Sequence, residues 1–285
     1  MQEDMNENLI KSIETLPPLP QTINELQAYI NEAGANASID EVGKIIGSDA
    51  VVTAKLLQLA NSPFYGFSRE ITTIQQVINL LGIGNIRNIV LADSIRSTSK
   101  IDMSAYNLDT KGFLRQCNEE TAFISAWLAD EDKRLSHLLV PCAMLLRFGM
   151  IVFSNFLVQE CKAAEFLAAL KARNFEEIGS VEEEFLGVDH ISFLGFLFYR
   201  WNFDESLIES VCFVNSPHSA RDSVKKNAYA LAITNHIFAP YNGGSNFRVN
   251  AALALIQEAA QQGIKFNEGN FKAKLPEFAK KNLNA

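Results

Sequence analysis

The amino-acid sequence predicts an all-α protein, and three observations support that class. Apolar residues recur three or four positions apart through most of the chain, which is the period of an amphipathic helix. Capping boxes, which pair Ser or Thr with Glu or Gln three residues later at a helix start, are predicted at Ser38–Glu41, Thr72–Gln75 and Ser180–Glu183. No convincing run alternates polar and apolar side chains, so we expect no sizeable sheet.

The expected helices fall into two groups. Residues 16–20 read LPPLP, a lead-in that cannot be helical beyond a first turn. Shorter helices follow it, one of them capped by Asp49 and stopped at Asn61. Longer helices are expected over 111–130, 135–157, 161–173, 180–200, 204–215, 219–238 and 248–262. The polar stretch 97–109 lies between the groups, so the sequence predicts helical subdomains at 1–98 and 109–285.

Charge and composition narrow the class of protein. The net charge of −8 and the pI near 5.1 argue against a protein that grips phosphate backbones, so nucleic acid is an unlikely partner. The acidic N-terminus has neither the basic nor the apolar region of a signal peptide. The four cysteines are widely spaced among apolar neighbours, as buried reduced thiols are. We therefore expect a cytoplasmic protein.

One apolar stretch is long enough to cross a bilayer. It runs over residues 138–158 and reads LLVPCAMLLRFGMIVFSNFLV. Arg147 falls near its centre, where a charge costs about 2.5–3.5 kcal/mol on insertion scales. Pro141 and Asn155 weaken a spanning helix further. We expect a buried pair of helices and no membrane insertion.

Two short motifs invite a nucleotide-binding or a DNA-binding interpretation. Residues 82–84 read GIG, but the third glycine and the preceding strand of a dinucleotide fingerprint are missing, so two glycines joining helices is the better interpretation. Residues 73–96 could form a helix-turn-helix whose second helix offers Arg87, Asn88 and Arg96 to DNA. The apolar positions of that helix look like core positions, which leaves a DNA-binding regulator only as an alternative.

The histidines do not form a metal-ligand pattern. The chain has four of them, His137, His190, His218 and His236. None lies four residues from another, as a helical metal pair would. Asp189 and His190 are the only adjacent acid–imidazole pair, and no serine or cysteine nucleophile has support from its neighbours.

Three stretches carry a resemblance to a known family. They are LPPLP at 16–20; the block 49–90, with TAKLLQLANS at 53–62 and Tyr65-Gly66; and GVDH at 187–190 followed by YRW at 199–201. In this order and spacing, over roughly residues 10–215, the chain resembles the HDOD family, degenerate relatives of the HD and HD-GYP phosphohydrolases. The resemblance implies an N-terminal helical bundle packed on a degenerate HD-like helical core.

The resemblance also implies what the protein does. HDOD proteins are non-enzymatic modules of bacterial signal transduction and regulation. We therefore expect a regulatory protein that acts by binding another signalling or regulatory protein, or a signal ligand. A residual metal-dependent phosphohydrolase acting on nucleotides or cyclic dinucleotides is the alternative. The oligomeric state, the partner and the pathway stay open.

The positions of the HD metal ligands can be compared with this chain. The HD dyad ends a helix reading Leu-Leu-His-Asp, and the matching run here is LLRF at 145–148. Arg147 and Phe148 replace the imidazole and carboxylate, and Asn235 stands where the late Asp is expected. A guanidinium has no lone pair for a metal and carries a permanent positive charge. The resemblance therefore implies no metal, no cofactor and no catalysis by the HD mechanism.

Arg147 is predicted to fill the vacated centre with its own charge. A buried arginine must be paired, and the early HD histidine falls near Glu119 or Glu120, either of which would be a natural partner. The remaining candidate contact residues for a ligand or partner are Asn61, Ser62, Tyr65, Asp189, His190 and Trp201. The first three more simply fix a turn, and His190 and Trp201 resemble packing and hydrogen-bonding anchors.

Overall fold

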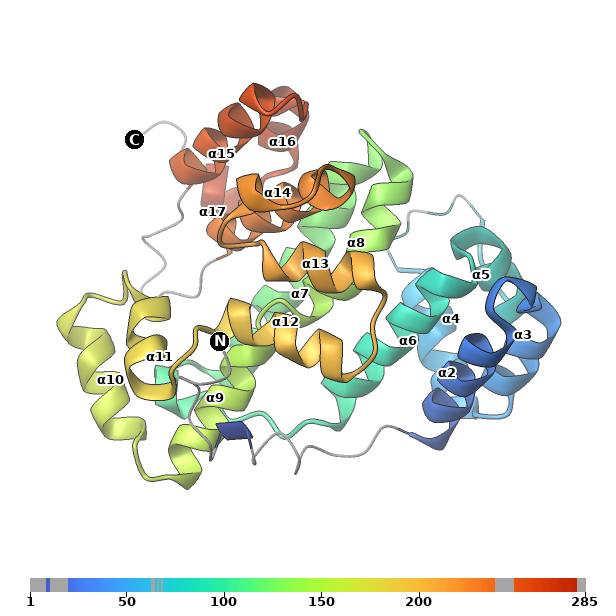
Figure 1. Cartoon of the computed structure of the whole chain (residues 1–285), viewed down its shortest axis with the longest axis horizontal. Helices are drawn as coiled ribbons and strands as arrows, with labels where there is room; N and C mark the ends of the chain where they lie inside the picture. The colour runs from blue at the N-terminus through green and yellow to red at the C-terminus, as the bar shows by residue number, and fades with distance from the viewer. Residues whose placement is uncertain are drawn as a thin grey trace.

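The computed structural model describes residues 9–10, 20–62, 65, 67, 69–238 and 249–280 (Figure 1). These described residues form helices and turns and include no strand, so the predicted all-α class is confirmed. Pro20 precedes the first long helix, while the rest of the LPPLP segment lies outside the described residues. Figure 1 shows a smaller group of helices at one end of the molecule, beside a larger helical body.

The smaller group holds five long helices. They are α2 (Gln21–Ala33), α3 (Ile39–Gly47), α4 (Ala50–Ala60), α5 (Ile74–Leu81) and α6 (Ile83–Thr98). Each buries an apolar face, so that Ile23 of α2, Ile46 of α3 and Val77 of α5 are at most 1% exposed. Burial of these faces holds the group together, because isolated helices of this length are marginal in water.

The helix starts follow the predicted chemistry with one shift. Asp49 accepts two hydrogen bonds from the start of α4, as predicted. Ser38 accepts one from the Glu41 N–H, but the other half of the predicted capping box is missing, because the Ser38 N–H donates to the Tyr29 hydroxyl and not to the Glu41 side chain. The capping box predicted at Thr72–Gln75 is wrong by one residue, because Thr73 and Gln76 form it. With that start, Ile74 is the first helical residue, and it is buried.

The larger body follows a short buried turn at Ser104–Tyr106. Its helices are α7 (Thr110–Ala129), α8 (Lys133–Leu145), α9 (Phe148–Gln159), α10 (Ala163–Ala172), α11 (Ile178–Leu186), α12 (His190–Arg200), α13 (Glu205–Cys212), α14 (Asp222–Ile237), α15 (Val249–Gln261), α16 (Glu268–Lys274) and α17 (Glu277–Lys280). The antiparallel pair α7 and α8 makes the most extensive helix–helix contact of the molecule's described part.

Two of the predicted long helices are divided. The helix expected over 135–157 breaks at Leu146 and Arg147, between α8 and α9. The helix expected over 180–200 breaks at Gly187, whose φ of 77° ends α11, and α12 then starts behind Asp189. The capping box at Ser180–Glu183 is therefore wrong, since α11 starts at Ile178 and Ser180 lies inside its first turn.

The two groups of helices pack on each other. Helix α6 lies against α8, and α6 also reaches α13, since Arg87 and Asn88 both donate hydrogen bonds to the Asp204 carboxylate at its start. Gln27 of α2 donates a hydrogen bond to the Trp201 carbonyl over 3.1 Å. An N-terminal bundle is thus packed on a larger helical core, as predicted.

The apolar stretch of the sequence lies in the interior. In the part of the chain that the structure describes, only Lys133–Gln159 is long and apolar enough to cross a membrane. The structure folds it into α8 and α9, and 94% of its most apolar window is buried against other helices. The expected pair of buried helices is therefore observed.

Candidate functional site

Arg147 lies at the junction of α8 and α9, in the middle of the larger body. Its backbone forms the turn that separates the two helices, with φ −97° and ψ 5°. This turn aims the side chain inward, where it is only 4% exposed. The break between the helices is therefore what places a guanidinium inside the core.

The guanidinium is held by two neighbouring helices. Its Nε and Nη2 donate to the two carboxylate oxygens of Glu120 on α7, over 3.2 and 3.0 Å. Its Nη1 and Nη2 donate to the side-chain and backbone oxygens of Asn235 on α14, over 2.5 and 3.0 Å. Arg147 thus has Glu120 as its partner, whereas Glu119 is exposed. Bidentate pairing of this kind is the strong form of an arginine–carboxylate contact.

Burial dominates the electrostatics of this pair. Glu120 is fully buried, and burial raises the pKa of its carboxyl group to about 7, although the charge and hydrogen bonds of Arg147 act in the opposite direction. A buried ion pair is tolerated only when its remaining hydrogen-bonding groups are satisfied. Asn235 accepts two further hydrogen bonds of the guanidinium with its side-chain and backbone oxygens.

These residues do not fit a divalent cation. Arg147, the residue predicted to replace the HD imidazole, has a guanidinium whose donors already contact Glu120 and Asn235, and such a group cannot coordinate a metal. Phe148 is buried beside it and packs edge-on against the ring of Trp201, with centroids 5.5 Å apart. Within the described residues, no cluster of three His, Cys, Asp or Glu side chains has the arrangement of a metal site.

A second buried network adjoins the first. Glu182 of α11 is fully buried and accepts hydrogen bonds from the Tyr106 hydroxyl over 2.6 Å, and from the backbone N–H and ring Nδ1 of His190 over 2.8 and 2.7 Å. The sequence analysis missed Glu182. It could have been found from spacing, because Ile178, Glu182 and Leu186 lie four residues apart on one inward face.

His190 and Asp189 start α12 in this second network. Asp189 caps the helix by accepting hydrogen bonds from the backbone N–H groups of Ile191 and Ser192 over 2.9 and 3.1 Å. Burial opposes ionisation of Asp189, but the charge of His190 and the hydrogen bonds from Ser192 and Asn215 leave its pKa below the usual value. The Nε2 atom of His190 is buried and has no hydrogen-bond partner among the described residues.

A cleft of about 380 Å³ opens between the two networks. Its walls come from the turn before α9, the starts of α11 and α12, and the end of α14. Arg147, Glu177, Gly179, Ser180, Glu183, His190, Asn235 and His236 are among its lining residues. Gly149 brings α9 close to α12, because a Cβ there would lie 2.4 Å from the His190 carbonyl oxygen. The cleft thus brings together two candidate contact residues, Asp189 and His190, and two positions compared with the HD metal ligands, Arg147 and Asn235.

The candidate residues Asn61, Ser62 and Tyr65 lie apart from this cleft. Asn61 ends α4 and bridges to Ile71, accepting from its N–H over 2.8 Å and donating to its carbonyl over 2.7 Å. Ser62 donates to the Leu59 carbonyl over 2.6 Å. The Tyr65 ring is buried against Phe67 and His137. These contacts fix a turn, which is the simpler of the two predicted roles.

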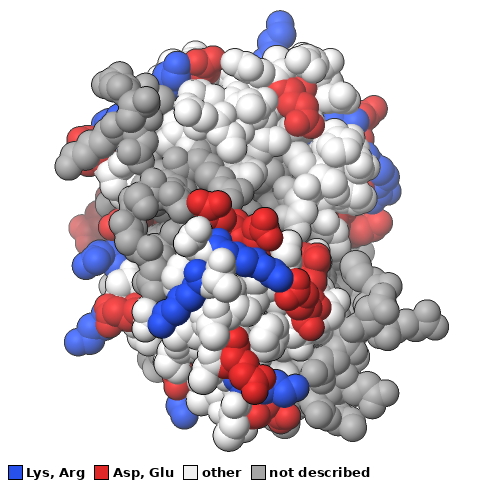
Figure 2. All heavy atoms as spheres, turned by 90° about the vertical axis from the view of Figure 1, so that its left-hand side faces the viewer, with Lys and Arg blue, Asp and Glu red and all other residues white. Residues whose placement is uncertain are grey.

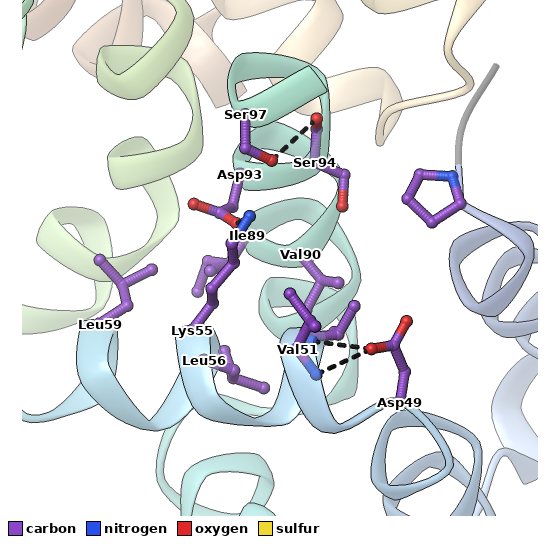
Figure 3. Close-up of a pocket in the computed structure, with 12 residues that line it drawn as sticks. Asp49, Val51, Lys55, Leu56, Leu59, Ile89, Val90, Asp93, Ser94 and Ser97 are labelled. Carbon is purple, nitrogen blue, oxygen red and sulfur yellow. Dashed lines mark hydrogen bonds and ion pairs between the residues drawn. The ribbon is translucent and has the colours of Figure 1, made fainter. Parts of the chain in front are cut away.

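A separate apolar groove runs between α4 and α6 (Figure 3). Its volume is about 220 Å³, and its walls include Val51, Leu56 and Val90. Lys55 and Asp93 approach each other to 3.6 Å across it. Asn61, Ser62 and Tyr65 are not among its lining residues. No pattern in the sequence predicts this groove, because it forms only where α4 and α6 lie side by side.

The possible recognition helix of a helix-turn-helix does not present its polar residues. Arg87 is 8% exposed and Asn88 is fully buried, and both bond to Asp204 on α13. Arg96 donates a hydrogen bond to Asn118 of α7. A recognition helix must expose such side chains to base edges. The geometry of α6 therefore gives the DNA-binding alternative no support.

Comparison with known proteins shows the family. A model of the HDOD domain matches residues 16–217, which is more than half of the chain, so this protein belongs to the HDOD domain family. The predicted resemblance is confirmed. No curated protein matches the chain significantly.

Several solved structures are similar along almost the whole chain. A virulence factor from Campylobacter jejuni subsp. jejuni is 61% identical, with a TM-score of 0.66 over 100% of this chain and 99% of that one. A proposed phosphohydrolase from Shewanella amazonensis SB2B is 25% identical, with a TM-score of 0.67 over 94% and 93%. An HDOD domain protein of unknown function from Geobacter sulfurreducens is 18% identical and shares the fold, with a TM-score of 0.61 over 94% and 93%.

Proposed function

We propose that this chain is a non-enzymatic regulatory protein of bacterial signalling, which acts in the cytoplasm by binding a protein partner or a signal ligand. HDOD membership fits a regulatory role. The observation that carries the proposal is the filled centre, where Arg147, Glu120 and Asn235 satisfy one another in place of metal ligands. Metal-assisted hydrolysis requires a cation that activates water or polarises a phosphoryl oxygen, and a buried guanidinium does neither.

The similarity to a virulence factor from Campylobacter jejuni supports a bacterial setting for this role. We further propose that residues 1–98 and 109–285 are the two subdomains, and that Asp189, His190 and Arg147 belong to the surface or cleft that the partner or ligand uses. Affinity purification from the native cell, with wild type and Arg147→Ala compared, would identify a partner that depends on this region.

The alternative is a residual phosphohydrolase, and the relative described as a proposed phosphohydrolase is the observation that favours it. The two functions separate in one assay. Purified protein is incubated with Mn²⁺ or Mg²⁺ and with nucleotides, cyclic dinucleotides and an aryl phosphate. The regulatory proposal expects no metal-dependent turnover above that of a protein-free control. Metal-dependent turnover by the purified chain would favour the hydrolase.

A further inference from the structure

The start of α11 forms one wall of the cleft and carries unused hydrogen-bond donors. The first intrahelical bond of α11 runs from the Val181 N–H to the Glu177 carbonyl, over 3.1 Å. The N–H groups of Ile178, Gly179 and Ser180 therefore have no acceptor within the helix. No side chain of the described residues caps them. All three residues line the cleft, so their donors and the positive end of the helix dipole are available there.

The opposite wall adds donors from side chains. Asn235 accepts from Arg147 through Oδ1, which leaves its amide nitrogen as a donor. Arg147 donates four hydrogen bonds, and five are possible for a guanidinium, so one N–H at Nη1 remains. Both residues line the same cleft as the start of α11.

His190 gives a second and independent indication of a ligand. Its side chain is 10% exposed and lines the cleft, and its Nε2 has no partner among the described residues. Because Nδ1 contacts the Glu182 carboxylate, that nitrogen carries a proton and Nε2 is the atom left for a ligand. If His190 is neutral, Nε2 accepts a hydrogen bond from an O–H group of the ligand, such as that of a monohydrogen phosphate. If His190 is charged, Nε2–H donates a hydrogen bond to an ionised oxygen of the ligand. A buried polar atom without a partner is costly, so a ligand atom at this point is favourable.

Acidic side chains at the rim limit the charge of the ligand. Glu177 and Glu183 are exposed beside the cleft, where water and salt screen them. Figure 2 shows the side of the molecule that carries α10 and α11, where acidic and basic side chains are interspersed. Nη2 of Arg173, the residue that follows α10, lies 2.6 Å from Oε1 of Glu184 on α11, for example. No broad field of one sign therefore attracts a polyanion, and a small oxyanion with one or two charges fits best.

We propose that this cleft binds the oxyanion group of a small molecule, a phosphate or a carboxylate, between the start of α11 and the side chains of Asn235 and His190. The proposal rests on the proposed function, because it names the class of signal ligand that the regulatory protein would take. The cleft volume of about 380 Å³ suits a small molecule. When the oxyanion binds, the free N–H groups at the start of α11 and the Nε2 atom of His190 gain the hydrogen-bond partner that they lack.

The test uses the full chain, labelled with ¹⁵N, and inorganic phosphate and acetate as probes at constant ionic strength, with chloride as the reference salt. Either probe should give saturable shifts of the Ile178, Gly179 and Ser180 amide signals, and the stronger probe identifies the source of the oxyanion. Asn235→Asp replaces a donor by a carboxylate while keeping an acceptor for Arg147. It should weaken binding by about tenfold or more, because a like charge then faces the ligand.

Asn118→Asp is the matched control. It makes the same charge change in an exposed asparagine that also accepts from an arginine, Arg96, outside the cleft. It should leave the affinity for the probe within about twofold of wild type, since Asn118 is exposed and does not line the cleft, so that water and salt screen the new charge. The proposal is overturned if neither probe gives saturable shifts at these amides, or if Asn118→Asp weakens binding as much as Asn235→Asp.

The outcomes also separate this proposal from the proposed function. If neither probe binds and no substrate is turned over, the proposed oxyanion ligand is wrong, but the proposal of a regulatory protein that binds a protein partner still stands. Metal-dependent turnover would contradict the regulatory proposal even if phosphate binds in the cleft.

Discussion

Replacing Arg147 with methionine removes the charge and keeps most of the length of the side chain. The fully buried carboxylate of Glu120 then loses its two hydrogen bonds to Arg147, of 3.0 and 3.2 Å, and its only ion-pair partner among the described residues. Breaking one side of a buried pair costs about 3–5 kcal/mol. We expect Arg147→Met to lower the free energy of unfolding by that amount at pH values above about 7, as measured by urea unfolding followed by circular dichroism.

The pH dependence of this loss tests the same reasoning. In wild type, the pKa of Glu120 is raised from 4.5 to about 7, so its contribution to stability is fully present below about pH 4.5 and is lost as the pH rises through about 7. Arg147→Met removes the groups that oppose this rise, so the pKa of Glu120 in the variant lies higher still. The stability difference between the two proteins should therefore be smallest in acid and grow above pH 7, by at most about 1.4 kcal/mol per pH unit.

The double variant Arg147→Met with Glu120→Leu supplies the control. An apolar replacement of both members of a buried pair is often neutral, so the double variant should regain most of the stability that Arg147→Met loses. The reasoning is refuted if Arg147→Met costs less than about 1 kcal/mol, or if the losses of the two single variants simply add.

Three further predictions concern the surrounding structure. Asn61→Ala removes the side-chain bridge behind α4 and should cost about 1–3 kcal/mol in urea unfolding, with faster hydrogen exchange in the loop before α5. Gly149→Ala places a methyl group 2.4 Å from a backbone oxygen of α12 and should lower the unfolding free energy by about 1–3 kcal/mol, whereas Gly47→Ala, with open space around it, should be neutral or slightly stabilising. Asp189 has a lowered pKa, so its contribution to stability is present above its usual pKa of 3.8 and is lost as the pH falls; Asp189→Asn should flatten the acid limb of the stability curve.

The helical class of the protein was predictable because local signals agree with the fold. Apolar spacing identified the inward faces of α2, α4 and α5, and cap residues identified the starts of α3 and α4. Boundaries were less predictable where a segment is buried on all sides. The stretch that forms α8 and α9 is apolar throughout, so its spacing carries no mark of the turn at Arg147.

The capping errors have a common cause. A capping box is a short pattern, so more than one segment can satisfy it. Three pairs of this chain do: Thr72–Gln75, Thr73–Gln76 and Ser180–Glu183. In the structure, α5 starts at Ile74 and α11 starts at Ile178, and both of these isoleucines are buried. Tertiary burial therefore decided between starts that local chemistry left almost equal.

The site was predictable in part. Family resemblance located Arg147, and the cost of an unpaired buried charge required an acidic partner, which left Glu119 and Glu120. Only the three-dimensional packing of α7 on α8 decides between them, because the two residues point to different sides of one helix. The Glu182–His190 pair and the uncapped start of α11 depend on contacts between segments, and no local pattern shows that they share one cleft.

The central claim is that a paired guanidinium closes the former metal centre. The most direct measurement is the metal content of the purified chain after equilibration with Mn²⁺, Zn²⁺ or Fe²⁺ and removal of free ions. The filled centre predicts content well below one ion per chain, unchanged in a variant such as Glu119→Gln, which leaves the buried pair intact. One tightly bound ion per chain, lost when Glu120 or Asn235 is replaced by alanine, would contradict the account.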